Sequence, residues 1–368
     1  TGYFAGLVDT NLKWETNEQM NIGIDASFLQ GDLNLTMDYF IRKSKDLLLY
    51  RQIRPSTGFS QVYTNYGEIE NKGFEFSLAY NKRLNKDWSI NATLTGSTLK
   101  NKIKKMGEPA YNTNSDSSGK GTEDGSNTGA VGAAAGYHWG NHSVSMEGHA
   151  VGAFYGYIVD GLYQSYADIL GSPASTIGDV APGDFKYRDR NGDGKITPDD
   201  RTIIGDPTPD FTYGFSVGAD YKGFFLNADF YGVYGNEIFR NWGNGNSFAP
   251  FNYREERLDR WTGAGTSNWE PRSYTASAYN RENSTYMIED GSFFRIRNVQ
   301  LGYNFNKGLI EGLGIQALKV YFNVQNLKTW DNVNGFTPEF GGNATQFGVN
   351  NSGYPNPRIT SFGINVTF

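Results

Sequence analysis

The feature that most constrains the fold of this chain is an alternation of apolar and polar residues over segments of eight or more positions. One segment alternates from position 33 to 42, with Phe40 as its exception, and others alternate over 88–95 and 224–231. Successive side chains of a β-strand point to opposite faces, so each apolar set lies on one face of a sheet. The apolar sets are Leu33, Leu35, Met37, Tyr39 and Ile41; Trp88, Ile90, Ala92 and Leu94; and Phe224, Leu226, Ala228 and Phe230.

Alternation alone would also suit a soluble sandwich, but three details favour a transmembrane antiparallel β-barrel. The apolar sets begin or end in aromatic residues, as the aromatic girdles of membrane barrels do. The segments are about ten residues long, whereas strands of soluble proteins centre on about five or six residues. Their polar sides carry Asp and Arg, which suit a water-filled lumen better than a dry core.

Composition supports an all-β chain and argues against several other classes. Aromatic residues make up 15% of the 368 residues and 46 residues are Gly, which favours strands joined by many turns. The mean hydropathy of −0.55, without an apolar run of about 18 residues, argues against membrane helices. The formal charge of −6 argues against a nucleic-acid partner, and the lack of Cys excludes disulfides and thiolate chemistry.

The connections between predicted strands alternate in length, which predicts the two sides of a membrane. If Phe368 ends the last strand at the periplasm, counting backwards places every short turn in the periplasm and every long loop outside the cell. The count gives about ten strands, too few for loops this elaborate, so we expect part of a larger barrel. The short connections are 31–32, 84–87 and 222–223, a medium one with a helical turn is 307–318, and the long loops are 51–67, 107–209, 242–292 and 331–359.

The segment Phe154–Tyr163 reads as a strand within the long excursion 107–209. For the short turns and the long loops to stay on opposite sides of the membrane, the excursion must cross it an even number of times. It therefore contains either no membrane strand or two, the second near Tyr137–Met146. We favour a folded extracellular loop.

The two ends of the chain carry different signals. Thr360, Phe362, Ile364, Val366 and Phe368 alternate with polar residues, and a terminal aromatic resembles the assembly signal of outer-membrane barrels. Phe368 is therefore expected to be the true C-terminus. The chain starts at Thr1 without Met or a signal segment, which indicates a mature or internal piece of a longer protein.

The sharpest local motif is the stretch 189–200, which has the ligand spacing of a calcium loop. Asp189, Asn191 and Asp193 occupy positions 1, 3 and 5, Lys195 occupies position 7, which offers a backbone carbonyl, and Asp200 occupies position 12. Gly at position 6 permits the sharp turn that wraps oxygens around Ca²⁺. The Gly-rich flanks argue against a complete helix–loop–helix unit. A turn-rich loop without metal is the alternative.

No other stretch predicts chemistry. The three histidines, His138, His142 and His149, lie among Gly and Asn, which resist the helix that would bring two of them together as zinc ligands. No arrangement of nucleophile, base and acid is visible, so the chain is not expected to be an enzyme. Loop aromatics could stack on sugars or contact a protein; they are Tyr137, Trp139, Trp242, Phe248, Trp261, Trp269 and Tyr354.

Four long motifs and the final strand resemble the SusC/RagA group of TonB-dependent outer-membrane transporters. They occur in order along the chain: Asn65–Glu75 (NYGEIENKGFE); Gly183–Gly194 (GDFKYRDRNGDG), continuing through Asp200–Pro209 (DRTIIGDPTP); Glu289–Tyr303 (EDGSFFRIRNVQLGY); Val320–Leu327 (VYFNVQNL), followed by Thr337, Pro338 and Glu339; and Ser361–Phe368 (SFGINVTF).

This resemblance implies a barrel of roughly 22 strands around an N-terminal plug, of which residues 1–368 form the C-terminal portion. It also implies energy from the TonB complex acting through a plug that this chain lacks. A SusD-like extracellular lipoprotein would be the lid, the remaining N-terminal barrel and the outer-membrane lipid would be the other partners, and the cargo would be an oligosaccharide or a peptide.

The function predicted from the sequence is therefore active nutrient import across the bacterial outer membrane. The chain would supply lumen wall, loops and a surface for the lid, and the calcium loop would stiffen the long excursion. Two alternatives stay open: a passive pore or adhesin made from a small self-contained barrel, and a secreted calcium-binding β enzyme that acts on glycans.

Overall fold

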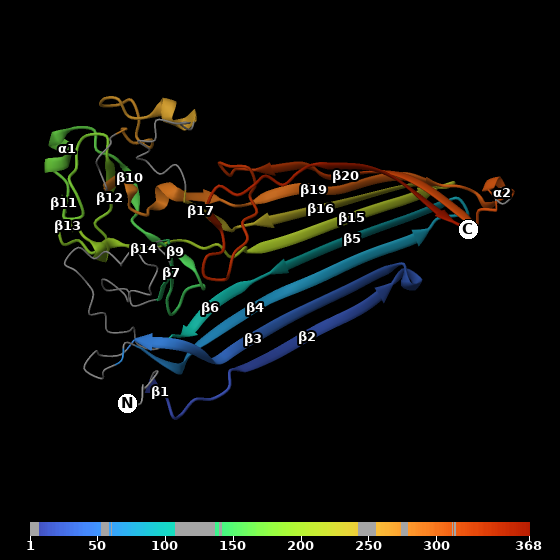
Figure 1. Cartoon of the computed structure of the whole chain (residues 1–368), viewed down its shortest axis with the longest axis horizontal. Helices are drawn as coiled ribbons and strands as arrows, with labels where there is room; N and C mark the ends of the chain where they lie inside the picture. Colours follow the sequence, from blue (N-terminus) through green and yellow to red (C-terminus); the bar gives the residue numbers. More distant parts are fainter. Residues whose placement is uncertain are drawn as a thin grey trace, which may run out of the picture.

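The computed structural model describes residues 7–52, 59, 61–106, 137–139, 142–241, 255–273, 279–310, 312 and 314–368. The largest unit is one sheet of long strands, which lie side by side in Figure 1. In spatial order its strands are β2 (Thr16–Phe28), β3 (Leu33–Gln52), β4 (Gln61–Arg83), β5 (Trp88–Thr98), β15 (Phe211–Tyr221), β16 (Phe224–Tyr234), β19 (Phe293–Asn304), β20 (Ala317–Asp331) and β22 (Ile359–Thr367).

Every neighbouring pair in this order is antiparallel, so the chain runs up and down across the sheet as a meander. The short strands β1 (Leu7–Val8) and β6 (Lys100–Lys105) add to β4. The sheet is curved but open in this chain, with β2 and β22 at its two edges. The prediction of an all-β, barrel-type fold is confirmed, with nine long strands among the described residues where about ten were expected.

The two ends of the sheet differ as the connection lengths predicted. The short turns, among them η1 (Leu29–Gly31) and α2 (Lys307–Ile310), lie at the end where Phe368 is found (Figure 1). All the long connections leave from the opposite end. One boundary was wrong: residues 61–67 were expected in a loop but belong to β4, which pairs with β3 as far as Gln52 across register shifts near Leu47. Among the described residues, no helix is long and apolar enough to cross a bilayer.

The register places apolar residues opposite apolar residues across the whole sheet. Many side chains on this face have no protein cover among the described residues: Ile22, Leu301 and Phe362 are 63%, 53% and 69% exposed. A broad exposed apolar face suits contact with lipid. Pairs on this face include Ile24 with Met37, Leu78 with Leu94, Phe215 with Phe230, Leu301 with Phe322 and Phe322 with Phe362.

The opposite face is polar and carries its own cross-strand hydrogen bonds. Thr36 Oγ1 donates to Asp25 Oδ1 at 2.8 Å, and Ser216 Oγ donates to Asp229 Oδ1 at 2.7 Å. Phe40, the exception in the alternating pattern, lies on this face over Gly73 of β4, where an added Cβ would meet its ring. The polar face therefore tolerates a ring because the neighbouring strand provides a glycine.

The same pairing of a ring with a glycine recurs across the sheet. A Cβ on any of these strand glycines would overlap a ring of the adjacent strand. The pairs are Phe76 over Gly96, Tyr213 over Gly232, Phe225 over Gly302 and Tyr321 over Gly363. Each ring covers the gap left by a missing side chain and fixes the strand register.

Aromatic residues also gather near both ends of the apolar face. At the short-turn end, Trp88 stacks on Tyr221 with ring centroids 4.4 Å apart. Toward the other end, Phe294 stacks between Tyr213 and Trp330, with centroid distances of 6.3 and 5.8 Å. Two aromatic bands at the margins of an apolar face are typical of membrane barrels.

The long connections fold together into a separate layer, which we call the loop cap. It comprises residues 137–139, 142–209, 235–241, 255–273, 279–292 and 332–358. Its small sheets are β14 (Thr202–Gly205) with β9 (Ala153–Gly156), β8 (Ser143–Ser145) and β7 (Tyr137–Trp139); β10 (Val159–Leu162) with β12 (Phe185–Tyr187); β11 (Ala174–Ser175) with β13 (Lys195–Ile196); and β17 (Glu237–Arg240) with β18 (Ile288–Asp290) and β21 (Val349–Asn350).

Short helical turns complete the loop cap: α1 (Tyr166–Leu170), η3 (Pro198–Asp200), η4 (Glu255–Asp259), η5 (Tyr279–Arg281) and η6 (Thr285–Met287). The segment 154–163 thus contributes β9 and β10 to small sheets and no strand to the large one. Of the two alternatives for this segment, the folded loop is confirmed.

Candidate functional site

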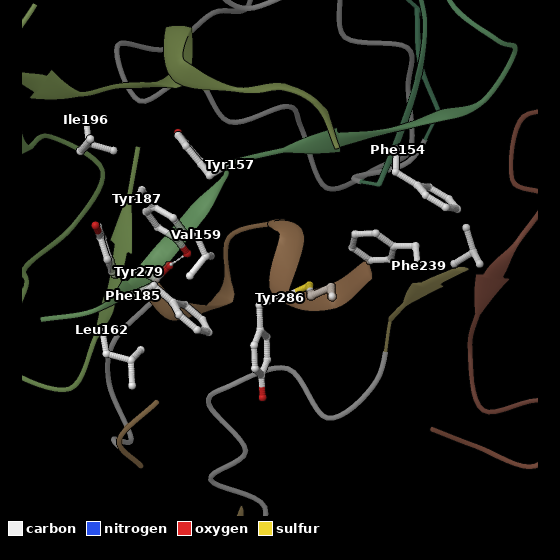
Figure 2. Close-up of a cluster of buried hydrophobic side chains, with 12 residues drawn as sticks. Phe154, Tyr157, Val159, Leu162, Phe185, Tyr187, Ile196, Phe239, Tyr279 and Tyr286 are labelled. Carbon is white, nitrogen blue, oxygen red and sulfur yellow. Dashed lines mark hydrogen bonds between the residues drawn. The ribbon is translucent and has the colours of Figure 1, made fainter. Parts of the chain in front are cut away.

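The loop cap has a dense aromatic core of its own (Figure 2). Tyr157 stacks on Tyr187 at 4.9 Å between ring centroids, and Phe185 packs against Tyr286 at 4.8 Å. The core joins strands of the 107–209 excursion to η5 and η6 of a second connection and to β21 of a third. The cap is therefore one packed unit built from three connections, which can present a preformed surface.

A buried carboxylate holds two of these connections together. Asp184, with no exposed surface, accepts two hydrogen bonds from Arg272, at 2.7 Å from Nε and 3.0 Å from Nη2. Its Oδ1 also accepts from Asn280 Nδ2 at 2.8 Å, and its Oδ2 accepts from the backbone N–H of Ala181 at 2.9 Å. Buried ions are stable only when paired and hydrogen-bonded in this way.

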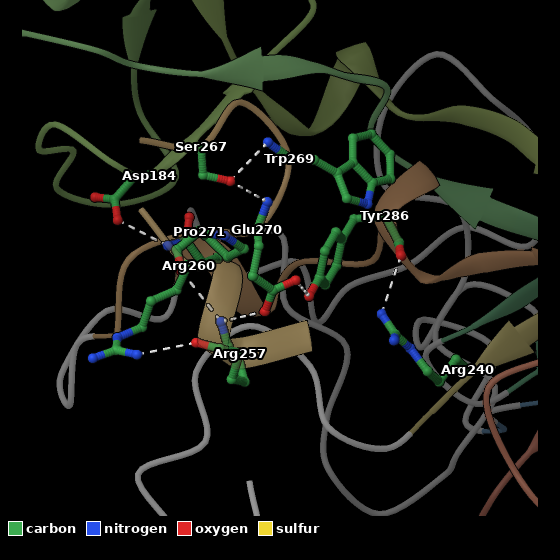
Figure 3. A network of polar contacts seen from close by, with 10 residues as sticks. Asp184, Arg240, Arg257, Arg260, Ser267, Trp269, Glu270, Pro271 and Tyr286 are labelled. Atoms are coloured by element: carbon green, nitrogen blue, oxygen red, sulfur yellow. Dashed lines mark hydrogen bonds and ion pairs between the residues drawn. The ribbon is translucent and has the colours of Figure 1, made fainter. Parts of the chain in front are cut away.

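A second network lies beside the first and uses a buried arginine (Figure 3). Arg257 of η4 lies 2.8 Å from Glu270 Oε1, and Glu270 Oε2 accepts a hydrogen bond from the Tyr286 hydroxyl at 2.7 Å. All three side chains are almost fully buried. The network ties η4 to the aromatic core through Tyr286.

The third connection is tied in by two further arginines. Arg240 Nη2 donates to the Tyr286 carbonyl at 3.2 Å (Figure 3), and its Nε lies 3.5 Å from Glu289. Glu289 in turn accepts from the backbone and side-chain nitrogens of Asn334, at 3.1 and 3.2 Å. Arg295, on the polar face of β19, lies 2.5 Å from Glu339.

Burial shifts the pKa values of several groups of the loop cap. It lowers the pKa of His142, whose ring stacks on Phe239 at 4.9 Å, and it raises the pKa of Glu237. Burial also raises the pKa of the Tyr157 and Tyr279 hydroxyls well above the usual range. These tyrosines are packing groups that stay neutral, and they are not candidates for proton transfer.

The predicted calcium ligands Asp189, Asn191, Asp193, Lys195 and Asp200 lie together in one compact loop that ends in η3. Here the acidic side chains bind the backbone of the loop itself. Asp189 accepts from the N–H groups of Gly192 and Gly194 at 2.7 and 2.8 Å, and Asp200 accepts from Arg190 N and Thr197 N at 2.8 Å each.

A carboxylate offers about four acceptor positions, so these bonds leave room for a cation. Among the described residues, however, no group of three or more His, Cys, Asp or Glu side chains converges as metal ligands would. The calcium site at residues 189–200 therefore stays a prediction.

The other residues singled out in the sequence are scattered. The side chains of Tyr137, His138 and Trp139 lie outside what the structure describes, and so do the residues Trp242 and Phe248. His142 is partly buried and His149 is exposed. Trp261 packs against the aromatic core, while Trp269 and Tyr354 are 52% and 92% exposed.

Sequence reasoning missed the buried ion pairs of the cap. Asp184, Arg257, Glu270 and Arg272 look like ordinary polar loop residues, because their partners are 88 and 13 positions away along the chain. The one available signal was Asp184 itself, which lies in a motif shared with a known family.

Comparison with known proteins identifies a family that matches this chain. The family described as TonB dependent receptor-like, beta-barrel matches residues 1–327. TonB-dependent receptor P3 of Formosa agariphila is 32% identical over 98% of the chain, and TonB-dependent receptor SusC of Bacteroides thetaiotaomicron is 26% identical over 97%. The chain covers only 35% and 32% of these two relatives, or about a third of their length.

Solved structures agree on the fold. The structure of the RagAB peptide transporter superposes with a TM-score of 0.72 over 97% of this chain and 36% of its own, at 24% identity. Its sequence match, its two-faced meander and its folded loops show that the chain belongs to the family of TonB-dependent receptor β-barrels, as a C-terminal part of such a protein.

Proposed function

We propose that this chain forms the C-terminal part of the barrel of a TonB-dependent transporter that imports nutrients across the bacterial outer membrane. The family is one of receptors and transporters, and no catalytic function accompanies it. The observation that carries the proposal is the continuous two-faced sheet of a chain that matches this family over residues 1–327. An apolar outer face and a polar inner face are what a wall between lipid and a hydrophilic path requires.

In this mechanism the chain makes and breaks no covalent bond. Cargo, an oligosaccharide or a peptide, is captured at the loop cap under a SusD-like lipoprotein, and TonB acts on the plug of the complete protein. The packed aromatic core of the cap supports this division of labour, because a rigid surface loses less conformational entropy when a lid docks on it. The polar face of the sheet would then line the path. On this proposal the long loops are extracellular and the C-terminus is periplasmic.

The test uses the complete transporter in its native outer membrane. Extraction in mild detergent and affinity isolation through this chain, followed by peptide mass spectrometry, should recover plug peptides from the same polypeptide and a SusD-like lipoprotein. Uptake of its cargo should stop when tonB is deleted. Recovery of this chain alone, or conductance that needs neither a plug nor TonB, would overturn import and favour a passive pore.

A further inference from the structure

Two rows of charged side chains cross the apolar side of the large sheet at the end from which the long connections leave. In the first row, Lys72 of β4 is paired with Ile41 of β3 on one side and with Lys100 of β6 on the other. Paired residues of neighbouring antiparallel strands point to the same face, so both lysines stand on the face that carries Ile41. Along these strands, one face therefore changes from apolar to basic.

The second row lies two residues further along β4, where Glu70 is paired with Lys43 and Lys102. Glu70 Oε2 lies 3.7 Å from Lys43 Nζ, and its Oε1 lies 3.5 Å from Lys104 Nζ. The glutamate side chain is only 13% exposed, whereas those of Lys43 and Lys104 are 38% and 42% exposed. One carboxylate therefore holds two ammonium groups together while both stay accessible.

These lysines carry more positive charge than their neighbours neutralise. We call the following residues the lysine patch: Lys43, Lys72, Lys100, Lys102 and Lys104. Three of them, Lys72, Lys100 and Lys102, are exposed and form no ion pair with another residue that the structure describes. The next lysine of β3, Lys45, is already bound to Glu18 at 2.7 Å. Like charges this close repel one another, so the patch attracts anions.

The row on the other side of Lys72 has the character of a lipid contact. It consists of Ile22, Tyr39 and Phe74, paired across β2, β3 and β4 and 63%, 40% and 39% exposed. Rows on one face of a strand tilted by about 40° lie about 5 Å apart along the membrane normal. The lysine patch therefore begins about 5 Å beyond an aromatic row, which is the depth of lipid head groups.

The other end of the same strands is arranged differently. Lys82, near the end of β4, is bound to Asp32 in the turn between β2 and β3. Its charge is therefore already neutralised within the chain. The unpaired lysines of β4 and β6 lie at the loop end of the apolar face, which on the proposed function is the extracellular end.

We propose that the lysine patch binds the phosphate groups of a phosphorylated glycolipid in the outer leaflet of the outer membrane. The ammonium groups donate hydrogen bonds to phosphate oxygens, while acyl chains lie against the apolar rows beside them. A soluble anion would gain nothing from the aromatic row, and an acidic protein segment would have to enter the head-group layer to reach Lys72. The inference rests on the proposed function for the side of the membrane on which the patch lies.

The test titrates lipids into the complete transporter, purified and stripped of lipid in mild detergent, and measures bound molecules by native mass spectrometry. The probes are diphosphorylated lipid A, the same lipid without phosphate, and phosphatidylglycerol. We expect diphosphorylated lipid A to bind about tenfold or more tightly than its phosphate-free form. Lys72→Gln combined with Lys100→Gln and Lys102→Gln should weaken its binding about tenfold or more, because each ammonium group adds to the attraction.

The matched control makes the same change of charge at the other end of the sheet. It combines Lys86→Gln, Lys222→Gln and Lys307→Gln, three exposed lysines in the short connections. Binding of lipid A to this variant should stay close to that of the unmodified protein. Both triple variants should migrate as folded barrels on unheated gels, so that a loss of binding does not reflect a loss of folding.

Four results would overturn the site. Equal binding of the phosphate-free lipid would show that phosphate is not recognised, and equal losses in the two triple variants would show that the position of the lysines is irrelevant. Binding of phosphatidylglycerol as tight as that of lipid A would assign the patch to phospholipid. Displacement of lipid A by millimolar inorganic phosphate would indicate a site for free anions.

The binding measurement and the import function can fail separately. If uptake needs TonB but the purified protein does not distinguish lipid A from its phosphate-free form, the lipid site is wrong and import stands. If the lysine patch binds diphosphorylated lipid A as expected but uptake proceeds without TonB, import is wrong and the lipid site stands.

Discussion

Arg295 on β19 lies 2.5 Å from Glu339 in the connection between β20 and β22, and this ion pair joins the wall of the sheet to the loop cap. The arginine side chain is almost fully buried, while the glutamate is partly exposed. Thr329 Oγ1 accepts from Arg295 Nε at 2.8 Å, and Asn356 Nδ2 donates to Glu339 at 2.6 Å. The pair therefore holds both ends of one long connection against the polar face of the sheet.

Replacing Glu339 with Gln should loosen that connection without unfolding the sheet. The variant leaves the buried Arg295 charge without its counter-ion, which costs about 1 to 3 kcal/mol locally. Limited proteolysis of the complete protein should show faster cleavage within residues 332–358. Lys45→Gln is the control, since its ion pair with Glu18 lies on the exposed surface of β2 and β3. Equal cleavage in both variants would contradict the role of the pair.

Asp184→Asn should destabilise the loop cap more strongly. The substitution removes the charge that Arg272 binds through two hydrogen bonds, in a position with no exposed surface. Loss of one partner of a buried pair costs about 3 to 5 kcal/mol, less here because Arg272 is partly exposed. Hydrogen exchange should show faster opening of β10, β12 and η5.

The control for this variant is Asp160→Asn, which breaks an exposed pair with Arg188 in the same region. An exposed pair contributes about 0 to 1 kcal/mol, so exchange in that variant should change little. If Asp184→Asn exchanged no faster than Asp160→Asn, the buried network would not be what holds the connections together.

The large sheet was predictable from the sequence because its signals are local. A period of two, a turn of two residues at 222–223 and the alternation of loop lengths all lie within short stretches. Even Phe40, which breaks the pattern, agrees with the fold once Gly73 is seen beside it. The beginning of β4 at Gln61 was not predicted. Register shifts near Leu47 let β3 and β4 pair beyond the stretch in which apolar and polar residues alternate.

The loop cap was not predictable in the same way. Its ion pairs join residues such as Asp184 and Arg272, which no periodic pattern connects. A hollow of about 350 Å³ lined by Glu255, Glu256 and Phe336 forms where η4 meets a connection about 80 residues further along the chain, and tertiary packing decides that meeting. Local spacing did identify the 189–200 loop, but spacing alone does not reveal where its carboxylates point.

Gly363→Val should impair assembly of the barrel. A side chain at this position overlaps the ring of Tyr321 on the neighbouring strand, so either the ring or the register of β20 and β22 must move. We expect a smaller fraction of the complete protein to show the shifted mobility of folded barrels on unheated gels. Gly341→Val is the control because an added Cβ there meets no atom within 4 Å. If Gly363→Val folded as well as Gly341→Val, the ring-and-glycine pairing would not determine the register.

The loop cap should lose stability below about pH 6.5 because of His142. Burial lowers the pKa of this histidine in the folded protein, while the unfolded chain keeps the ordinary value of 6.5. The contribution of His142 to the free energy of unfolding is therefore fully present above pH 6.5. It falls as the pH drops toward the lower pKa of the folded protein, because the unfolded chain binds the proton first. Proteolysis of the cap from pH 8 to pH 5 should show this, and His142→Phe should flatten the dependence. If the rate of proteolysis depends on pH as strongly in His142→Phe as in the unmodified protein, groups other than His142 cause that dependence.

Binding of Ca²⁺ at residues 189–200 should be visible directly in the complete protein. Terbium luminescence sensitised by nearby tyrosines should rise on addition of Tb³⁺ and fall when Ca²⁺ displaces it. Asp193→Ala should abolish the signal, because it removes the predicted ligand at position 5 of the loop. The loop itself should stay folded, since Asp193 is exposed and the backbone hydrogen bonds of Asp189 and Asp200 are kept. Asp199→Asn is the control, since Asp199 is exposed in the same loop but does not occupy a ligand position. If neither ion altered luminescence and chelation left cleavage of this loop unchanged, its own hydrogen bonds would suffice to hold it and the calcium prediction would be wrong.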